Sequence, residues 1–190
     1  MINRIINKVK REWRKVTAIP RDQQPELPDY WFREVYSGKV AQVVQIGSND
    51  GKTGDPLHKL LLKNKKWKGL FVEPIPYVQL GSFDRNHLTQ HLDGKLIPFI
   101  KSLDIKGMTL PEVLDQWKID QIDILHIDCE GYDWKVLSQL DLTRYRPGLI
   151  LFEYHHLAPE ELAAARDFLS ADYKIKQLGI DYLAIRKERV

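Results

Sequence analysis

Polar residues follow several apolar runs in this sequence, and their spacing limits the chemistry that they could perform. The run "VVQI" leads into "GSNDGKT", where three residues separate Gly47 from Gly51. A phosphate-binding loop needs four residues between its first glycine and its Gly-Lys-Ser/Thr. A dinucleotide-binding fingerprint needs a second glycine at the position of Asn49. Asp50 would also repel a phosphate. Both phosphate-binding motifs are therefore excluded.

An acid after the next apolar run favours a nucleoside ligand without phosphates. Glu73 ends "GLFVEP", and an acid at the tip of a neighbouring strand can accept hydrogen bonds from ribose hydroxyls. S-adenosylmethionine fits, because its sulfonium cation tolerates Asp50. The alternative is that Gly47 and Gly51 only form a tight turn between a strand and a helix, and that Glu73 only caps the next helix. The candidate cofactor-binding residues are Gln45, Gly47, Ser48, Asn49, Asp50, Gly51 and Glu73.

Two later strand ends carry groups that could take or hold a proton. In "IDILHIDCEGYD", Asp128 and Glu130 alternate with apolar residues, and in "LILFEYHH", Glu153 and His155 share a parity beside His156. Ligands of open parallel sheets bind at such carboxyl ends. The alternative is that these acids cap helices and the histidines are ordinary loop residues. The candidate catalytic residues are Asp128, Glu130, Glu153 and His155.

The sequence leaves two roles open for these side chains. A carboxylate or imidazole could remove the proton of an acceptor hydroxyl as a general base. Alternatively, carboxylates could hold a divalent metal that lowers the pKa of that hydroxyl. His87 and His91 also have a zinc-like spacing, but without a third ligand nearby surface histidines are the favoured interpretation.

Helical and strand patterns alternate through most of the chain. Apolar runs predict strands at 40–46, 69–74, 122–128 and 148–154, and a hairpin at 173–186 that turns near Gly179. Helices are predicted at 30–37, 56–67, 109–117 and 158–169. This alternation predicts an α/β fold with a mostly parallel sheet covered on both faces and an antiparallel C-terminal hairpin.

The N-terminal segment differs from the rest in charge. Residues 2–15 predict an amphipathic helix with a basic outer face, and a proline-rich connector follows it. The helix could contact an anionic membrane or, as we favour, dock on its own domain or a dimer partner. We divide the chain into an N-terminal part, 1–38, and a main domain, 39–190. A non-catalytic adapter that binds a membrane or partner through residues 2–15 is the alternative function.

Composition narrows the protein class. The chain has 190 residues, 43% of them apolar, and a formal net charge of +3, which gives no reason to expect nucleic-acid binding. The single Cys129 excludes an internal disulfide framework. We see no membrane-spanning run or secretory signal, so we expect a cytoplasmic protein, with membrane-peripheral attachment as the variant.

The motifs "QIGSNDG", "FVEPIP", "LHIDCEGYDWKVL" and "LILFEYHHL", in this order, resemble the FkbM family of S-adenosylmethionine-dependent methyltransferases over about residues 40–185. The resemblance implies a class I methyltransferase (Rossmann-like) fold with seven strands, and O-methylation of sugars, glycans or natural products. It implies that the turn from Gly47 to Gly51 lies on the methionine and ribose side. It also implies that Glu73 binds the ribose, and that Asp128 and Glu130 face the reacting centre.

Two departures from the family pattern affect these expectations. Gln45 replaces the acid that usually ends the first strand, which weakens the expected contact with the amino group of the ligand. The segment after Glu73 is short for a helix and a third strand, and it suggests a missing loop near Val78 and Gln79.

Overall fold

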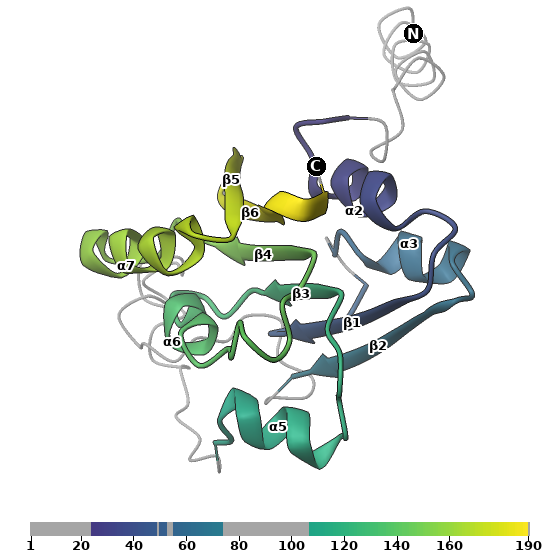
Figure 1. The fold of residues 1–190 in the computed structure, drawn as a ribbon, viewed down its shortest axis with the longest axis horizontal. Helices are drawn as coiled ribbons and strands as arrows, with labels where there is room; N and C mark the ends of the chain where they lie inside the picture. Colours follow the sequence, from purple (N-terminus) through teal and green to yellow (C-terminus); the bar gives the residue numbers. More distant parts are fainter. Residues whose placement is uncertain (1–23, 49, 53–54, 74–106, 190) are drawn as a thin grey trace, which may run out of the picture.

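A computed structural model describes residues 24–48, 50–52, 55–73 and 107–189 (Figure 1). The helices are α2 (Pro28–Tyr36), α3 (His58–Lys63), α5 (Leu110–Gln116), α6 (Asp133–Leu137) and α7 (Pro159–Ser170). The strands are β1 (Ala41–Ile46), β2 (Trp67–Val72), β3 (Ile124–Ile127), β4 (Leu149–Glu153), β5 (Tyr173–Leu178) and β6 (Asp181–Arg186), and a short 3-10 turn, η3 (Lys187–Arg189), follows.

The described strands form one mixed sheet in the order β2-β1-β3-β4-β6-β5. Strands β2, β1, β3 and β4 run parallel, whereas β6 is antiparallel to both β4 and β5. This confirms the predicted α/β fold with its C-terminal hairpin, which turns at Gly179 with a φ of 67°. The expected third strand, the amphipathic helix at 2–15, the suspected junction at Val78 and the pair of His87 and His91 all fall outside the described residues.

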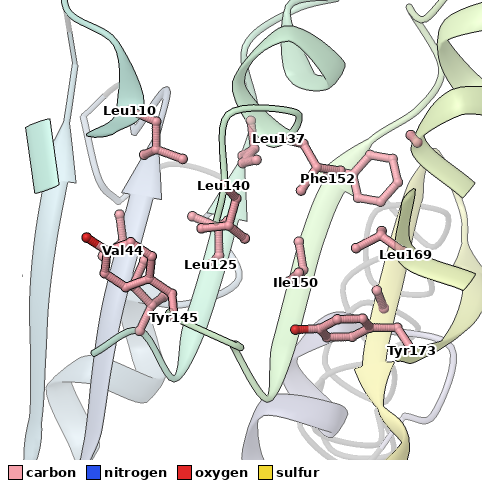
Figure 2. Close-up of a cluster of buried hydrophobic side chains, with 14 of the residues drawn as sticks. Val44, Leu110, Leu125, Leu137, Leu140, Tyr145, Ile150, Phe152, Leu169 and Tyr173 are labelled. Atoms are coloured by element: carbon pink, nitrogen blue, oxygen red, sulfur yellow. The ribbon is translucent and has the colours of Figure 1, made fainter. Parts of the chain in front are cut away.

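Helices cover both faces of the sheet because alternate strand residues point to opposite sides. Val43 packs with Phe32 of α2 and Leu60 of α3 on one face. Val44 packs on the other face with a larger cluster, drawn in Figure 2, to which α5, α6 and α7 contribute side chains such as Leu137. The β3 and β4 strands are buried along their whole length, as expected of central parallel strands.

Helix α2 attaches the segment before β1 to the sheet. It corresponds to the helix predicted at 30–37, and its Phe32 and Tyr36 side chains are almost fully buried. The Tyr36 hydroxyl donates a hydrogen bond of 2.9 Å to the carbonyl oxygen of Asp123, which directly precedes β3. The Asp123 carboxylate in turn accepts from the backbone N–H of Gln42 at 2.8 Å. Asp123 therefore joins α2, β1 and β3 at the end of the sheet opposite the predicted site.

Two helices differ from the sequence prediction. The helix expected at 56–67 is only the six-residue α3, because Asn64 ends it and Trp67 is buried as the first residue of β2. Helix α6 was not predicted, and it is short, with only five residues to show a helical period. Of the helices described, α7 is the longest at 12 residues, and none has the length and apolar character needed to cross a bilayer.

We expect Tyr36→Phe to lower the free energy of unfolding by about 1 kcal/mol, because it removes one buried hydrogen bond. Urea denaturation measures this. Tyr30→Phe, on the same helix, is the control and should change stability by less than about 0.5 kcal/mol. Equal effects of the two substitutions would contradict the role of the bond to Asp123.

Candidate active site

The glycine turn after β1 brings the backbones of β1 and β3 unusually close. Gly47 has a φ of 77°, and a Cβ atom placed there would lie 1.8 Å from the carbonyl oxygen of Asp128. Only glycine fits this approach, since a backbone oxygen cannot move away as a flexible side chain can. Gly51 also has a positive φ, of 60°, and its N–H donates to the Ser48 carbonyl at 2.7 Å, which closes the turn.

A row of polar side chains lies directly beneath this turn. Gln45 and His126 are register partners on the central strands β1 and β3, and both are buried. The Gln45 amide donates to Asp55 at 2.9 Å, and the Asp55 carboxylate accepts from the N–H groups of Leu57 and His58 at the start of α3. Gln45 thus links the β1 tip to α3 through Asp55, in the place where the family pattern has an acid.

Burial keeps His126 in its neutral form. It lowers the pKa of His126 from about 6.5 to about 4, although the negative charge of Asp55 acts in the opposite direction. Within the described part of the chain, neither His126 Nδ1 nor Gln45 Oε1 has a hydrogen-bond partner. The floor of the site is therefore a polar but uncharged layer.

The candidate acids form the next row of the same sheet face. Ile46, Ile127 and Phe152 are neighbours across β1, β3 and β4, and Glu153 is paired with Asp181 across β4 and β6. One residue beyond Ile46, Ile127 and Phe152, the same strand register places four residues side by side. They are Gly47, Asp128, Glu153 and Asp181.

Asp133, at the start of α6, holds two of these strand ends together. Its side chain is fully buried. One carboxylate oxygen accepts from the N–H of Glu153 at 3.2 Å, and the other accepts from the N–H of Cys129 at 3.3 Å. Burial and the charge of Asp128 raise the pKa of Asp133 to about 7. Asp133 belongs to the motif "LHIDCEGYDWKVL", but its bridging role was not predicted from the sequence.

Negative charge accumulates along the row. Burial raises the pKa of Glu153 to about 8, and the charges of Asp128, Glu130, Asp133 and Asp181 raise it further. Asp181, which sequence analysis missed, has a pKa raised to about 6 by burial and by Asp128. The strand tips therefore disfavour further negative charge and favour a cation.

Asp128 is the member of this row that solvent reaches most easily. Desolvation by the surrounding protein raises the pKa of Asp128 to about 6, and the charges of Glu130, Asp55 and Glu73 add to this rise. The side chain is nevertheless exposed, so water screens these charges. The tip of β2 adjoins the glycine turn, because the N–H groups of Gly47 and Ser48 both donate to the Val72 carbonyl, one residue before Glu73.

His156, rather than His155, meets the acids. Its Nε2 atom lies 3.5 Å from Glu153 and 3.7 Å from Glu130. His155 is exposed and contacts the His156 ring edge to face, with the ring centroids 5.0 Å apart. The parity argument favoured His155, but β4 ends at Glu153, so strand alternation no longer applies two residues later.

A pocket of about 430 Å³ adjoins the glycine turn. Its lining combines the turn, α3 and β2: Ser48, Asp50, Gly51, His58, Leu61, Leu62 and Phe71. The pocket thus offers polar groups from the turn and apolar ones from α3 and β2. Asn49, between two of these lining residues, falls outside the described residues. Glu73 and Asp128 are not part of the lining.

The chain matches one family model, and it is similar in fold to a solved methyltransferase structure. The model of the methyltransferase FkbM domain matches residues 86–179. The MycE methyltransferase of the mycinamycin biosynthetic pathway, solved with Mg and SAH, has a TM-score of 0.50 at 14% identity and aligns over 83% of this chain. That alignment covers 44% of MycE, so this chain spans less than half of its length. A Methanococcus jannaschii fibrillarin pre-rRNA processing protein has a TM-score of 0.47 at 12% identity, with 80% of this chain and 68% of that chain covered. No curated protein matches the sequence.

We expect Asp133→Ala to lower the free energy of unfolding by about 3 kcal/mol, because two buried N–H groups lose their acceptor. Chemical denaturation at pH 7 measures the loss. Asp133→Asn is the matched control, since it keeps one acceptor oxygen and should cost clearly less. An alanine variant as stable as the wild type would contradict the bridging role of Asp133.

The neutral state of His126 predicts a pH-dependent stability. Between pH 6.5 and about 4, His126 takes up a proton in the unfolded chain but not in the folded protein. The contribution of His126 to the free energy of unfolding is therefore complete above pH 6.5 and decreases as the pH is lowered. Relative to His126→Leu, the wild type should lose about 2 kcal/mol between pH 7 and pH 5. Urea midpoints of both proteins at the two pH values test this. A stability difference that does not vary with pH would contradict it.

Proposed function

We propose that this chain is an S-adenosylmethionine-dependent O-methyltransferase whose acceptor is a hydroxyl of a sugar, glycan or natural product. The match of the methyltransferase FkbM domain model to residues 86–179 supports this. The observation that supports this most is that the glycine turn, Glu73 and the acidic row lie at the same end of the sheet. In open α/β sheets ligands bind outside the carboxyl ends of the strands, where the strand order reverses. Here the reversal lies between β1 and β3.

The proposed cofactor contacts follow from this arrangement. The backbone of the turn from Gly47 to Gly51 can approach a ligand closely, and Glu73 at the tip of β2 would accept hydrogen bonds from the ribose hydroxyls. Gln45, Ser48, Asn49 and Asp50 complete the proposed set. The acidic row suits a sulfonium cation, whereas a phosphate would be repelled. This electrostatic preference supports S-adenosylmethionine as the methyl donor.

Methyl transfer to an alcohol requires the removal of one proton. The hydroxyl oxygen forms a bond to the methyl carbon as the carbon–sulfur bond breaks, which leaves a neutral thioether and a proton to be accepted. We assign the proton to the Asp128 carboxylate, because Asp128 is exposed whereas Glu153 is buried. Glu130 and Glu153 belong to the proposed surroundings of the acceptor, as general base or metal ligands, and His155 belongs there as an alternative general base.

Titration with S-adenosylhomocysteine, followed by calorimetry, tests the cofactor assignment directly. We expect saturable binding to the full chain. The absence of heat at millimolar ligand would overturn the proposal, since a transferase of this kind must bind its product.

Two substitutions separate binding from catalysis. Glu73→Ala should weaken S-adenosylhomocysteine binding by roughly tenfold or more, because it removes charged hydrogen bonds to the ribose. Asp128→Asn should leave that binding within about twofold and abolish transfer of labelled methyl groups to a panel of sugar and natural-product acceptors. The reverse pattern would refute these two roles.

A further inference from the structure

The three side chains of Glu130, Glu153 and His156 converge from separate parts of the backbone. Each offers one oxygen or nitrogen atom, and the three atoms lie within 4.8 Å of one another. Glu153 is the last residue of β4, His156 follows three residues later, and Glu130 lies in the turn after β3. Gly131 rests against His156, because a Cβ atom at Gly131 would lie 3.4 Å from the His156 Cβ.

From this geometry we propose that Glu130, Glu153 and His156 bind a divalent first-row transition metal such as Zn²⁺ or Mn²⁺. Ligands bound at about 2.1 Å from a tetrahedral centre lie about 3.4 Å apart. His156 Nε2 is already 3.5 Å from Glu153 and 3.7 Å from Glu130. Small side-chain rotations would therefore complete the coordination.

The burial of Glu153 is a second observation that favours a cation at this position. Its side chain is 7% exposed, and its described ion-pair partner is His156, with no Lys or Arg of the described chain paired to it. Asp181 is its cross-strand neighbour, and Asp133 lies at its backbone N–H. A buried carboxylate among other carboxylates is costly unless a cation balances it.

The ligand types determine which metal suits the site. Imidazole nitrogen favours zinc and other transition metals, whereas Mg²⁺ and Ca²⁺ prefer oxygen ligands alone. Mn²⁺ accepts carboxylates readily and binds less tightly than Zn²⁺ in the general order of affinities. We therefore expect Zn²⁺ to bind most tightly, then Mn²⁺, with Mg²⁺ weakest.

Three protein ligands leave positions open for water or for an oxygen of the acceptor. When bound, the metal would lower the pKa of a water or an acceptor hydroxyl at such a position. This catalytic role of the metal rests on the proposed methyl transfer. Metal binding itself does not depend on that function. Asp128, beside the site in the same strand-tip row, remains the proposed proton acceptor.

The test uses the full chain after treatment with a chelator, titrated with ZnCl₂, MnCl₂ or MgCl₂ in a calorimeter at pH 7.5. We expect one Zn²⁺ per chain, and Mg²⁺ binding at least roughly tenfold weaker. His156→Ala and Glu153→Gln should each weaken Zn²⁺ binding at least roughly tenfold, with circular dichroism to verify folding. His155→Ala removes the neighbouring exposed histidine and should leave Zn²⁺ affinity within about twofold.

A paramagnetic readout identifies the ligand without measuring activity. Mn²⁺ should broaden the imidazole NMR signals of His156 before those of His58. Absence of Zn²⁺ binding, or Zn²⁺ binding unchanged by both His156→Ala and Glu153→Gln, would overturn the metal site. S-adenosylhomocysteine titrated in the presence of chelator keeps the two proposals separate, because its binding supports the methyltransferase assignment whatever the metal result.

Discussion

The carboxylate of Asp133 accepts hydrogen bonds from two backbone N–H groups, one after β3 and one at the end of β4. This pair of bonds fixes how the two strand ends lie relative to each other. Helix α6 begins at Asp133 and contributes Leu137 to the core, so the anchor is itself held by packing. The positions of Asp128 and Glu153 both depend on it, because each is at or next to a backbone atom that Asp133 holds.

Several carboxyl groups lie close together at these same strand ends. Beneath them, Gln45 and neutral His126 provide a polar layer that adds no charge. Within the acidic row Glu153 is buried, whereas Asp128 is exposed to solvent. Under the proposals above, the buried acid would hold a cation while the exposed acid meets a ligand from solvent.

Much of this arrangement was predictable from local patterns. The apolar runs located each described strand to within two residues, because buried parallel strands need nearly continuous apolar sequence. Glycine at position 47 was predictable as a close approach, although its partner, the Asp128 carbonyl, was not. The role of Asp181 was hidden, because it becomes a neighbour of Glu153 only through antiparallel pairing of β6 with β4. His156 was underrated because parity ceases to apply where β4 ends.

The sequence by itself determined the alternation of helices and strands, the failure of both phosphate-binding motifs and the identity of most acids at the strand tips. Those features depend on residue type and spacing along one segment. Only the tertiary structure decided which acids share a row, that Asp133 joins the ends of β3 and β4, and that His156 lies close to both Glu130 and Glu153. Such contacts depend on the register between strands and on where each strand stops, and neither is encoded within a single segment.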